Sequence, residues 1–318
     1  MKNTSQDIAA DLCLANTPRE LIRRGEKLFE AAGLVYGHGT DNALDEAAVL
    51  VLHALHIGYE QPDIVLDEVL SAEGCDRAAR LLALRISSRK PAAYLIREAW
   101  FAGMPFYVDE RVLVPRSPIA ELIEAQFTPW IDPAAVRQVL DLCTGSGCIG
   151  LACAHYFPGA SVTLTDLSAD ALEVARVNIA RHDLQERVSL LQSDVFKALE
   201  GQCFDIIVSN PPYVPQLEML ELGPEFQHEP TMGLVAGGDG MDIVLRILRD
   251  AAGHLNEHGI LVVEVGYSQD LLVECLPDVP FVWLDFEFGG EGVFLLDRAA
   301  LDACQPIFDV AAAGRVVS

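Results

Sequence analysis

The fold of this chain is decided by the stretch Val139-Leu140-Asp141-Leu142-Cys143-Thr144-Gly145-Ser146-Gly147-Cys148-Ile149-Gly150. It opens with a short apolar run, which is typical of a buried strand, and continues into glycines spaced as Gly-x-Gly-x-x-Gly. Glycines in such a loop allow a tight turn and a close approach of the backbone to a ligand at the start of a helix. We therefore expect a strand, a ligand-binding loop and a helix in succession.

Around this stretch, from about Ala135 onward, apolar runs of strand length alternate with stretches of helical pattern. Such alternation predicts an α/β domain whose mostly parallel sheet is covered by helices on both faces. Ligands of such sheets bind at the carboxyl ends of the strands, near the topological switch point. The seven predicted strands are 137–142, 161–166, 187–191, 205–209, 260–265, 281–285 and 293–296, and the predicted helices are 119–125, 148–155, 169–182, 241–254 and 268–275.

Three successive strands of this pattern end near an aspartate. Asp141 can bind a cationic amino group or organise the loop, Asp166 can accept both hydroxyls of a ribose, and Asp194 can accept from an adenine amino group while Val195 packs on the ring. The glycine motif alone also fits NAD, but an amino group, a ribose and an adenine without phosphate describe S-adenosylmethionine. The candidate cofactor-binding residues are Arg116, Asp141, Cys143, Thr144, Gly145, Ser146, Gly147, Cys148, Asp166, Leu167, Asp194, Val195 and Asn210.

A second motif, Asn210-Pro211-Pro212-Tyr213, follows the fourth strand of the predicted sheet. The prolines stiffen the backbone, so the Asn210 side-chain oxygen and the Pro211 carbonyl can each accept one hydrogen of an incoming amino group. Tyr213 can stack on a flat group. This arrangement orients a planar nitrogen whose lone pair is otherwise delocalised, and it stabilises the positive charge that the nitrogen gains on methylation. We expect these four residues to be catalytic; the alternative is that Pro-Pro only ends a strand.

The first part of the chain reads as helical, and no catalytic motif occurs there. Thr17-Pro18 resembles a helix N-cap followed by proline, and a further helix is expected from Asp45. His53 and His56 are three apart and can share a helical face, but packing or capping is favoured over metal binding, and we predict no metal site. The polar loop 37–42 is either a recognition loop or a turn that caps the next helix.

Between the two parts, the pattern changes to short strands separated by turns, predicted at 93–96, 100–101, 106–108 and 112–114. We therefore expect a helical domain at 1–90, a β-hairpin linker at 91–115 and an α/β domain at 116–310. Arg116 follows the hairpin on a proline-stiffened segment. It is a candidate to reach the site, although a surface arginine is the simpler interpretation.

Composition limits the environment and the partners. The 318 residues carry a formal net charge of −25, which disfavours general nucleic-acid binding and suits a basic protein partner or simply solubility. The apolar runs are too short to cross a membrane, and Met1 to Asp7 lack the apolar core of a signal peptide. The eight cysteines form no Cys-x-x-Cys pair and are expected to be free thiols in the cytoplasm.

Taken together, the glycine motif and Asn210-Pro211-Pro212-Tyr213 resemble the class I methyltransferases that modify planar nitrogens. The helical front domain, the hairpin and Glu229-Pro230 make the chain similar to the glutamine N(5)-methyltransferases of release factors and ribosomal proteins. Within that family, release-factor enzymes usually carry Pro-Arg-Pro where this chain has Pro115-Arg116-Ser117. With the stretches 37–42, 98–103 and 288–294, this difference favours members that act on large-subunit ribosomal protein L-3.

The resemblance implies a Rossmann-like domain, S-adenosylmethionine as cofactor and a basic ribosomal protein as substrate, met during ribosome assembly. It does not imply sequence-specific nucleic-acid binding. Four alternatives are a release-factor methyltransferase, an adenine N(6)-methyltransferase of nucleic acid, a cofactor-binding assembly factor without catalysis, and an NAD dehydrogenase. The second would need a Lys/Arg-rich groove, and no such stretch occurs in the sequence.

Overall fold

The computed structural model describes residues 12–58, 63–215, 223–235 and 237–313. The chain divides into two compact units. The first contains Met1–Glu98 together with the short segment Leu222–His228, and the second contains Ala99–Glu221 and Glu229–Ser318. A piece of chain that follows the Asn-Pro-Pro-Tyr motif is thus part of the helical unit.

The first unit is helical, as predicted. Three of its described helices begin where the sequence offers a side chain to cap them: Thr17 accepts from the backbone N–H of Glu20, Asn42 from that of Asp45, and Ser71 from that of Gly74. The loop 37–42 therefore ends in a helix cap. The elements are α2 (Pro18–Ala32), α3 (Ala43–Leu55), η1 (Asp63–Asp67), α4 (Ala72–Ser88), α5 (Ala92–Ile96) and η4 (Pro224–His228).

Two local predictions in this unit are wrong. Residues 92–96 form the short helix α5 and no strand, because Pro91 starts a helical turn that packs its apolar residues into the unit's core. His56 does not share a helical face with His53, since His56 takes a left-handed conformation (φ 57°) and ends α3. Among the described residues, no group of three His, Cys, Asp or Glu side chains is arranged to hold a metal ion.

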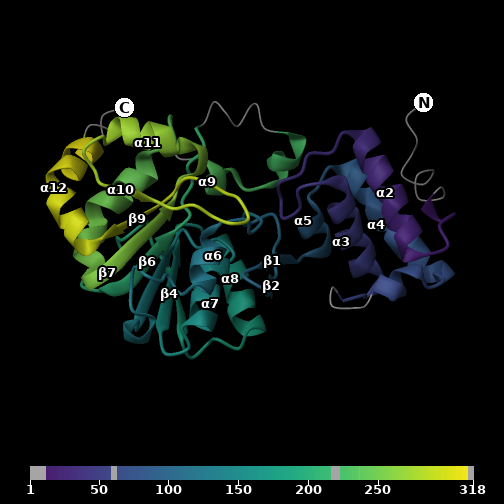
Figure 1. Ribbon diagram of the computed structural model, residues 1–318, viewed down its shortest axis with the longest axis horizontal. Coiled ribbons are helices and arrows are strands. Elements are labelled where there is room, and N and C mark those ends of the chain that lie inside the picture. The colour runs from purple at the N-terminus through teal and green to yellow at the C-terminus, as the bar shows by residue number, and fades with distance from the viewer. Residues whose placement is uncertain (1–11, 59–62, 216–222, 236, 314–318) are drawn as a thin grey trace. The chain divides into compact units, whose positions relative to one another are not determined.

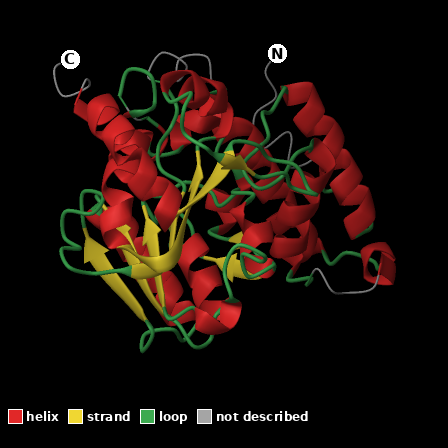
Figure 2. Ribbon diagram, turned by 60° about the vertical axis from the view of Figure 1, so that its left-hand side comes forward, coloured by secondary structure: helices red, strands yellow, loops and turns green. Residues whose placement is uncertain are grey.

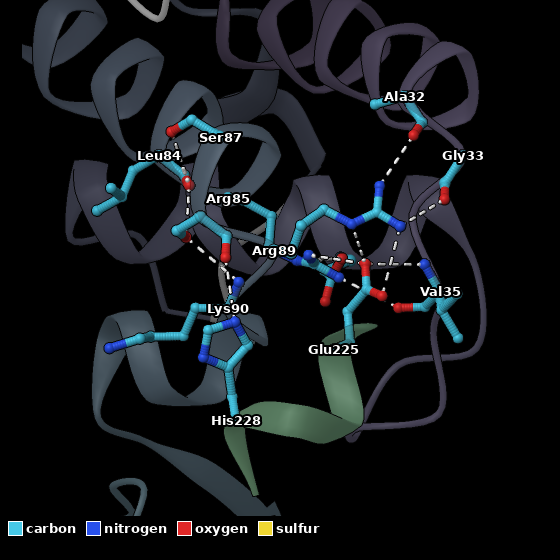
Figure 3. Close-up of polar contacts among 12 residues, drawn as sticks. Ala32, Gly33, Val35, Leu84, Arg85, Ser87, Arg89, Lys90, Glu225 and His228 are labelled. Atoms are coloured by element: carbon cyan, nitrogen blue, oxygen red, sulfur yellow. Dashed lines mark hydrogen bonds and ion pairs between the residues drawn. The ribbon is translucent and has the colours of Figure 1, made fainter. Parts of the chain in front are cut away.

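An ion network lies inside this unit. Arg85 of α4 is completely buried; its Nε lies 3.0 Å from Glu46, its Nη1 3.4 Å from Glu225, and its Nη2 donates to the Val35 carbonyl. Arg89 approaches the same Glu225 carboxylate at 3.0 Å. Figure 3 shows both arginines pointing toward Glu225, which the η4 segment carries into the unit. Burying these charges is possible only because they neutralise one another.

The second unit is built on the predicted seven-stranded, mostly parallel sheet, with the order β5-β4-β3-β6-β7-β9-β8. β5, β4, β3, β6 and β7 are parallel neighbours, and β9 is antiparallel to both β7 and β8. Because β4 lies on one side of β3 and β6 on the other, the topological switch point is at the carboxyl ends of β3 and β6. The strands are β3 (Gln138–Leu142), β4 (Ser161–Asp166), β5 (Val188–Gln192), β6 (Phe204–Ser209), β7 (Leu255–Glu264), β8 (Val282–Trp283) and β9 (Val293–Asp297).

Helices cover both faces of this sheet (Figures 1 and 2). The alternating side chains of β3 divide between two cores: Val139 packs with the first helix group and Leu140 with the second. The first group comprises α6 (Ile119–Glu124), α7 (Cys148–Tyr156) and α8 (Ala169–Arg181), and the second comprises α10 (Asp242–Ala251), α11 (Gln269–Cys275) and α12 (Arg298–Ala313). No helix in the described part of the chain is long and apolar enough to cross a membrane.

The β-hairpin belongs to the second unit and is shorter than predicted. β1 (Ala99–Phe101) pairs antiparallel with β2 (Met104–Phe106). The predicted strand at 112–114 is wrong, since these residues form no regular structure. After the hairpin, the backbone of Tyr107 is fixed by the side chain of Asn178 on α8, which accepts from its N–H at 2.7 Å and donates to its carbonyl at 2.9 Å.

Candidate active site

The glycine loop lies between β3 and α7, at the switch point of the sheet. Cys143, Gly145 and Gly147 all have positive φ angles of 57°, 54° and 84°, so the loop turns in a way that favours glycine. Thr144 N donates to the carbonyl of Thr165 on β4 at 2.9 Å, which holds the loop against the next strand. A side chain built on Gly145 would meet nothing within 4 Å, so the loop backbone faces open space there.

The side chain of Asp141, in β3, holds this loop through hydrogen bonds. Its Oδ2 accepts from the Thr144 hydroxyl at 2.5 Å and from the Gly150 N–H at 2.9 Å. Its Oδ1 is buried and accepts no hydrogen bond from any residue that the structure describes. Complete burial raises the pKa of Asp141 to about 7, against these two hydrogen bonds, which lower it. An unused buried acceptor beside a glycine loop is the kind of group that fits a cationic amino group.

Asp166 stands at the carboxyl end of β4, where it was expected. Its Oδ2 accepts from the Gly145 N–H at 2.9 Å, and its Oδ1 accepts from the Ser168 N–H at 2.8 Å. Burial raises the pKa of this carboxyl group, while the backbone hydrogen bonds lower it. Each oxygen keeps a second lone pair for a ligand hydroxyl. Leu167 follows with 54% of its surface exposed, which leaves its side chain available for contact.

Asp194 lies after β5 and is held by two cations. Its Oδ1 lies 2.5 Å from Arg246 of α10, and its Oδ2 lies 2.6 Å from Lys197. The hydrogen bond from Lys197, followed by that from Arg246, holds the pKa of Asp194 below its ordinary value. Val195 is buried and has a positive φ of 53°. The N–H of Ser193 donates to the Asp166 carbonyl at 3.0 Å, so the ends of β4 and β5 are joined.

The Asn-Pro-Pro-Tyr motif follows β6 and is tied to the glycine loop, because Ser209 Oγ donates to the Leu142 carbonyl at 2.8 Å. Asn210 is partly exposed and Pro211 is buried. Tyr213 packs its ring against Gly266, where a Cβ would come within 3 Å of the ring. Burial raises the pKa of the Tyr213 phenol, so it stays protonated and acts as a hydrogen-bond donor.

Arg116 is placed beside this motif, and it is not a free surface arginine. Its guanidinium makes a bidentate pair with Glu229, at 2.7 Å and 2.9 Å, and its side chain is 29% exposed. Glu229 also accepts from the Val114 N–H at 3.1 Å, which fixes the segment that carries the arginine. Burial raises the pKa of Tyr213, and the positive charge of Arg116 acts against that rise.

Two residues of this site were missed by sequence reasoning. Glu264 ends β7 and is buried; it accepts from the Ser117 hydroxyl at 2.5 Å and from the Tyr213 hydroxyl at 3.2 Å. Asn178 is completely buried and donates to the Ser146 carbonyl at 2.8 Å, which connects the glycine loop to the hairpin exit. The sequence signal that could have identified Glu264 is a lone charged residue inside the apolar run Val262-Val263-Glu264-Val265.

The cysteines of the glycine loop are not nucleophiles. Burial raises the pKa of the Cys143 thiol and raises that of Cys148 to about 12, so both stay protonated near neutral pH. Cys143 and Cys148 stay candidate cofactor contacts through their positions in the loop.

A parallel sheet with this switch-point loop and this motif on the adjacent strand defines a class I methyltransferase. The family model "Methyltransferase small domain" matches residues 126–240. A ribosomal protein uL3 glutamine methyltransferase of Xanthomonas campestris pv. campestris is 50% identical over 285 residues, covering 89% of this chain and 92% of the relative. Those of Francisella tularensis subsp. tularensis and Bordetella pertussis are each 46% identical, covering 92% and 90% of this chain and 92% and 96% of the relatives. The chain belongs to the family of ribosomal protein uL3 glutamine methyltransferases.

Solved structures resemble the chain more distantly. A methyltransferase from Pyrococcus furiosus has a TM-score of 0.44 and 21% identity, covering 62% of this chain and 89% of its own. The amino-terminal domain of human METTL16, solved in complex with SAH, has a TM-score of 0.42 and 16% identity, covering 68% of this chain and 81% of its own. Both scores lie below 0.5, and the family assignment rests on the sequence relatives.

Proposed function

We propose that this protein methylates the side-chain amide nitrogen of a glutamine in ribosomal protein uL3, also written L-3, with S-adenosylmethionine as methyl donor. The observation that carries the proposal is the position of Asn210-Pro211-Pro212-Tyr213. The motif follows β6 directly beside β3, whose own end forms the glycine loop. A donor held by the loop and an amide held by the motif would therefore meet at one edge of the sheet.

The residues of the loop fit the cofactor. When bound, S-adenosylmethionine supplies an electrophilic methyl group on a sulfonium centre. Asp141 has a buried oxygen that accepts from no donor in the described part of the chain, which suits the cofactor's amino group, and Asp166 has lone pairs for the ribose hydroxyls. Asp194, in its ion pairs with Arg246 and Lys197, remains an acceptor for the adenine amino group. Leu167 and Val195 would border the adenine ring.

The motif orients the substrate. The side-chain oxygen of Asn210 and the carbonyl oxygen of Pro211 would each accept one N–H of the glutamine amide, so that its lone pair points toward the methyl group. Both acceptors carry partial negative charge, which stabilises the nitrogen as it becomes positive. No strong base is needed before transfer, because one proton can leave to water afterwards. Tyr213 would border the planar amide, and the ion pair of Arg116 with Glu229 fixes the segment that follows the hairpin.

Several features support a basic protein as the substrate. The net charge of −25 attracts a basic ribosomal protein and repels the phosphates of nucleic acid, which disfavours adenine methylation. The sequence relatives carry a uL3 name, which favours uL3 over release factors. We assign recognition of the substrate to the helical unit, in the cytoplasm and during ribosome assembly.

The proposal is tested by methyl transfer to purified uL3. The protein is incubated with uL3 and isotopically labelled S-adenosylmethionine, and the label is located by mass spectrometry. Label on one glutamine is expected, and label on a release factor or on nucleic acid in parallel reactions, with none on uL3, would overturn the proposal. Asn210→Ala should lower the rate roughly 10²–10³-fold, as removal of one oxyanion-hole donor does. The matched control is Asn256→Ala, which removes a hydrogen bond to Asp205 near the start of β6 and should leave the rate unchanged.

A further inference from the structure

Glu264 stands in register with Asn210 at the end of the sheet. Ser209, the last residue of β6, pairs with Val263 of β7. Asn210 and Glu264 are therefore the next residues on two neighbouring parallel strands. Residues aligned in this way project their side chains to the same face of a sheet, about 5 Å apart. The carboxylate of Glu264 is thus a neighbour of the Asn210 carboxamide.

The hydrogen bonds around Glu264 all run toward its carboxylate. Oε2 accepts from the Ser117 hydroxyl at 2.5 Å, and Oε1 accepts from the Tyr213 hydroxyl at 3.2 Å. The Ser117 oxygen itself accepts from the Ile119 N–H at 3.2 Å, which leaves the hydroxyl proton for Glu264. An ionised carboxylate only accepts hydrogen bonds, so this arrangement is built for the ionised form.

We propose that ionised Glu264 is a positioning residue that accepts a hydrogen bond from Nδ2 of Asn210 and so turns Oδ1 of Asn210 toward the substrate amide. The proposal rests on the proposed function, in which that oxygen holds the glutamine. A carboxamide has one accepting and one donating end. If Glu264 is protonated, its O–H donates to Oδ1, the carboxamide turns over, and its N–H groups oppose those of the glutamine.

The charges near Glu264 place this change within the ordinary pH range. Tyr213 donates to Glu264, and the positive charge of Arg116, which is paired with Glu229, acts on it. Tyr267 acts in turn on Tyr213. Burial raises the pKa of Glu264 to about 7, while hydrogen bonds from Ser117, Tyr213 and Asn210 and the charge of Arg116 oppose the rise. Ionisation of one carboxyl group would therefore switch the clamp between its two orientations near neutral pH.

The first test observes Asn210 directly and needs no substrate. The sequence contains six asparagines, so labelling with ¹⁵N-asparagine gives six side-chain amide pairs, and the pair missing in Asn210→Ala is assigned to Asn210. These signals should shift with pH through a midpoint near 7 in the wild-type protein and should not shift in Glu264→Gln. Asn210 signals that do not titrate, or that titrate equally in Glu264→Gln, would overturn the proposal.

The second test measures the methylation rate of uL3 as a function of pH. The wild-type rate should rise about tenfold per pH unit below the midpoint and level off above it. Glu264→Gln should lose roughly 10- to 100-fold at pH 8, the effect of one charged hydrogen bond, and its rate should not depend on pH. A pH profile of Glu264→Gln that matches the wild type would contradict the role of Glu264.

Ser117→Ala separates positioning from a merely structural effect. Because the Ser117 hydroxyl lowers the pKa of Glu264, its loss should move the midpoint to higher pH and keep the plateau rate. The matched control is Ser71→Ala. Ser71 is the N-cap of α4 in the helical unit, so its removal should leave the midpoint unchanged. An unmoved midpoint in Ser117→Ala would count against the proposal. Absence of any methylated glutamine with the wild-type protein would instead refute the proposed function, while the amide titration still decides the role of Glu264.

Discussion

Replacing Arg85 by methionine should destabilise the helical unit by about 3–5 kcal/mol at pH 7, the cost of removing one partner from a buried ion pair. Methionine keeps most of the volume, so the change tests charge and not packing. Arg89 still neutralises Glu225, but Glu46, whose side chain is 1% exposed, loses Arg85, the one cation that pairs with it among the described residues. The uncompensated carboxyl group is then Glu46.

The magnitude of the destabilisation follows from the free energy needed to protonate Glu46 in the folded state. Burial already raises the pKa of Glu46, and the charge and hydrogen bond of Arg85 are the main influences that lower it. Without Arg85, the carboxyl group takes up a proton in the folded state. Relative to the ordinary value of 4.5, holding that proton at pH 7 costs about 3–4 kcal/mol. At pH 5 the same proton costs less than about 1 kcal/mol.

The sign of the pH effect is therefore fixed. In Arg85→Met, the pKa of Glu46 in the folded state lies above that in the unfolded state. Its contribution to stability is present at low pH and is lost as the pH rises toward that raised pKa. The variant should be close to the wild type at pH 5 and clearly weaker at pH 7.

The measurement is urea unfolding followed by two signals. All three tryptophans, at positions 100, 130 and 283, belong to the second unit, so their fluorescence reports that unit. Circular dichroism at 222 nm also reports the helical unit. With a slope of about 1–2 kcal/mol per molar urea, the helical transition should move by roughly 2 M.

The matched control is Arg80→Met on the same helix. Arg80 pairs with Asp76, but the two side chains are 74% and 50% exposed, and an exposed pair contributes at most about 1 kcal/mol. A shift in Arg85→Met no larger than that of Arg80→Met, or a shift equal at pH 5 and pH 7, would refute the reasoning.

Two further predictions concern the methyltransferase unit. Gly150→Ala should lower the free energy of unfolding by about 1–3 kcal/mol in thermal unfolding, because the new methyl group would collide with Leu164. In the control Gly159→Ala the methyl group meets nothing within 4 Å, so the free energy of unfolding should change by less than about 0.5 kcal/mol. Asp141→Asn should remove part of the pH dependence of the free energy of unfolding. Because the pKa of Asp141 is raised in the folded, cofactor-free protein, this carboxyl group favours the folded state at low pH, and up to about 4 kcal/mol of that stability is lost as the pH rises from 4 to 7. Equal slopes of unfolding free energy against pH in wild type and variant would contradict the second prediction.

The core of the fold could be predicted because its signals are local. The apolar run 139–142 and the glycines after it predict a strand, a loop and a helix from neighbouring residues alone, and the structure has β3 and α7 there. The helix cap at Thr17 is equally local. The strand predicted in residues 92–96 was wrong because its signal is not decisive locally. A five-residue apolar run fits a strand or a helical turn, and only packing in the core decides between them.

The missing part of the site depends on contacts between distant residues. The role of Glu264 depends on its hydrogen bonds with Ser117 and Tyr213, which lie 147 and 51 positions away in the sequence. Without the order of the strands, nothing indicates that β7 follows β6 in the sheet or which residues are in register. The partner of Arg116 was unpredictable for the same reason, since Glu229 lies 113 positions later in the chain.

The segment Leu222–His228 has a practical consequence for dissecting this enzyme. Because Glu225 completes the buried network of the helical unit, a fragment that stops at Glu98 would enclose Arg85 without one of its two carboxylates. Conversely, a single proteolytic cut after Glu98 would leave the two pieces associated, since the larger piece still supplies residues 223–228 to the fold of the smaller one. Chimeras that exchange recognition domains between relatives should therefore transplant both segments together.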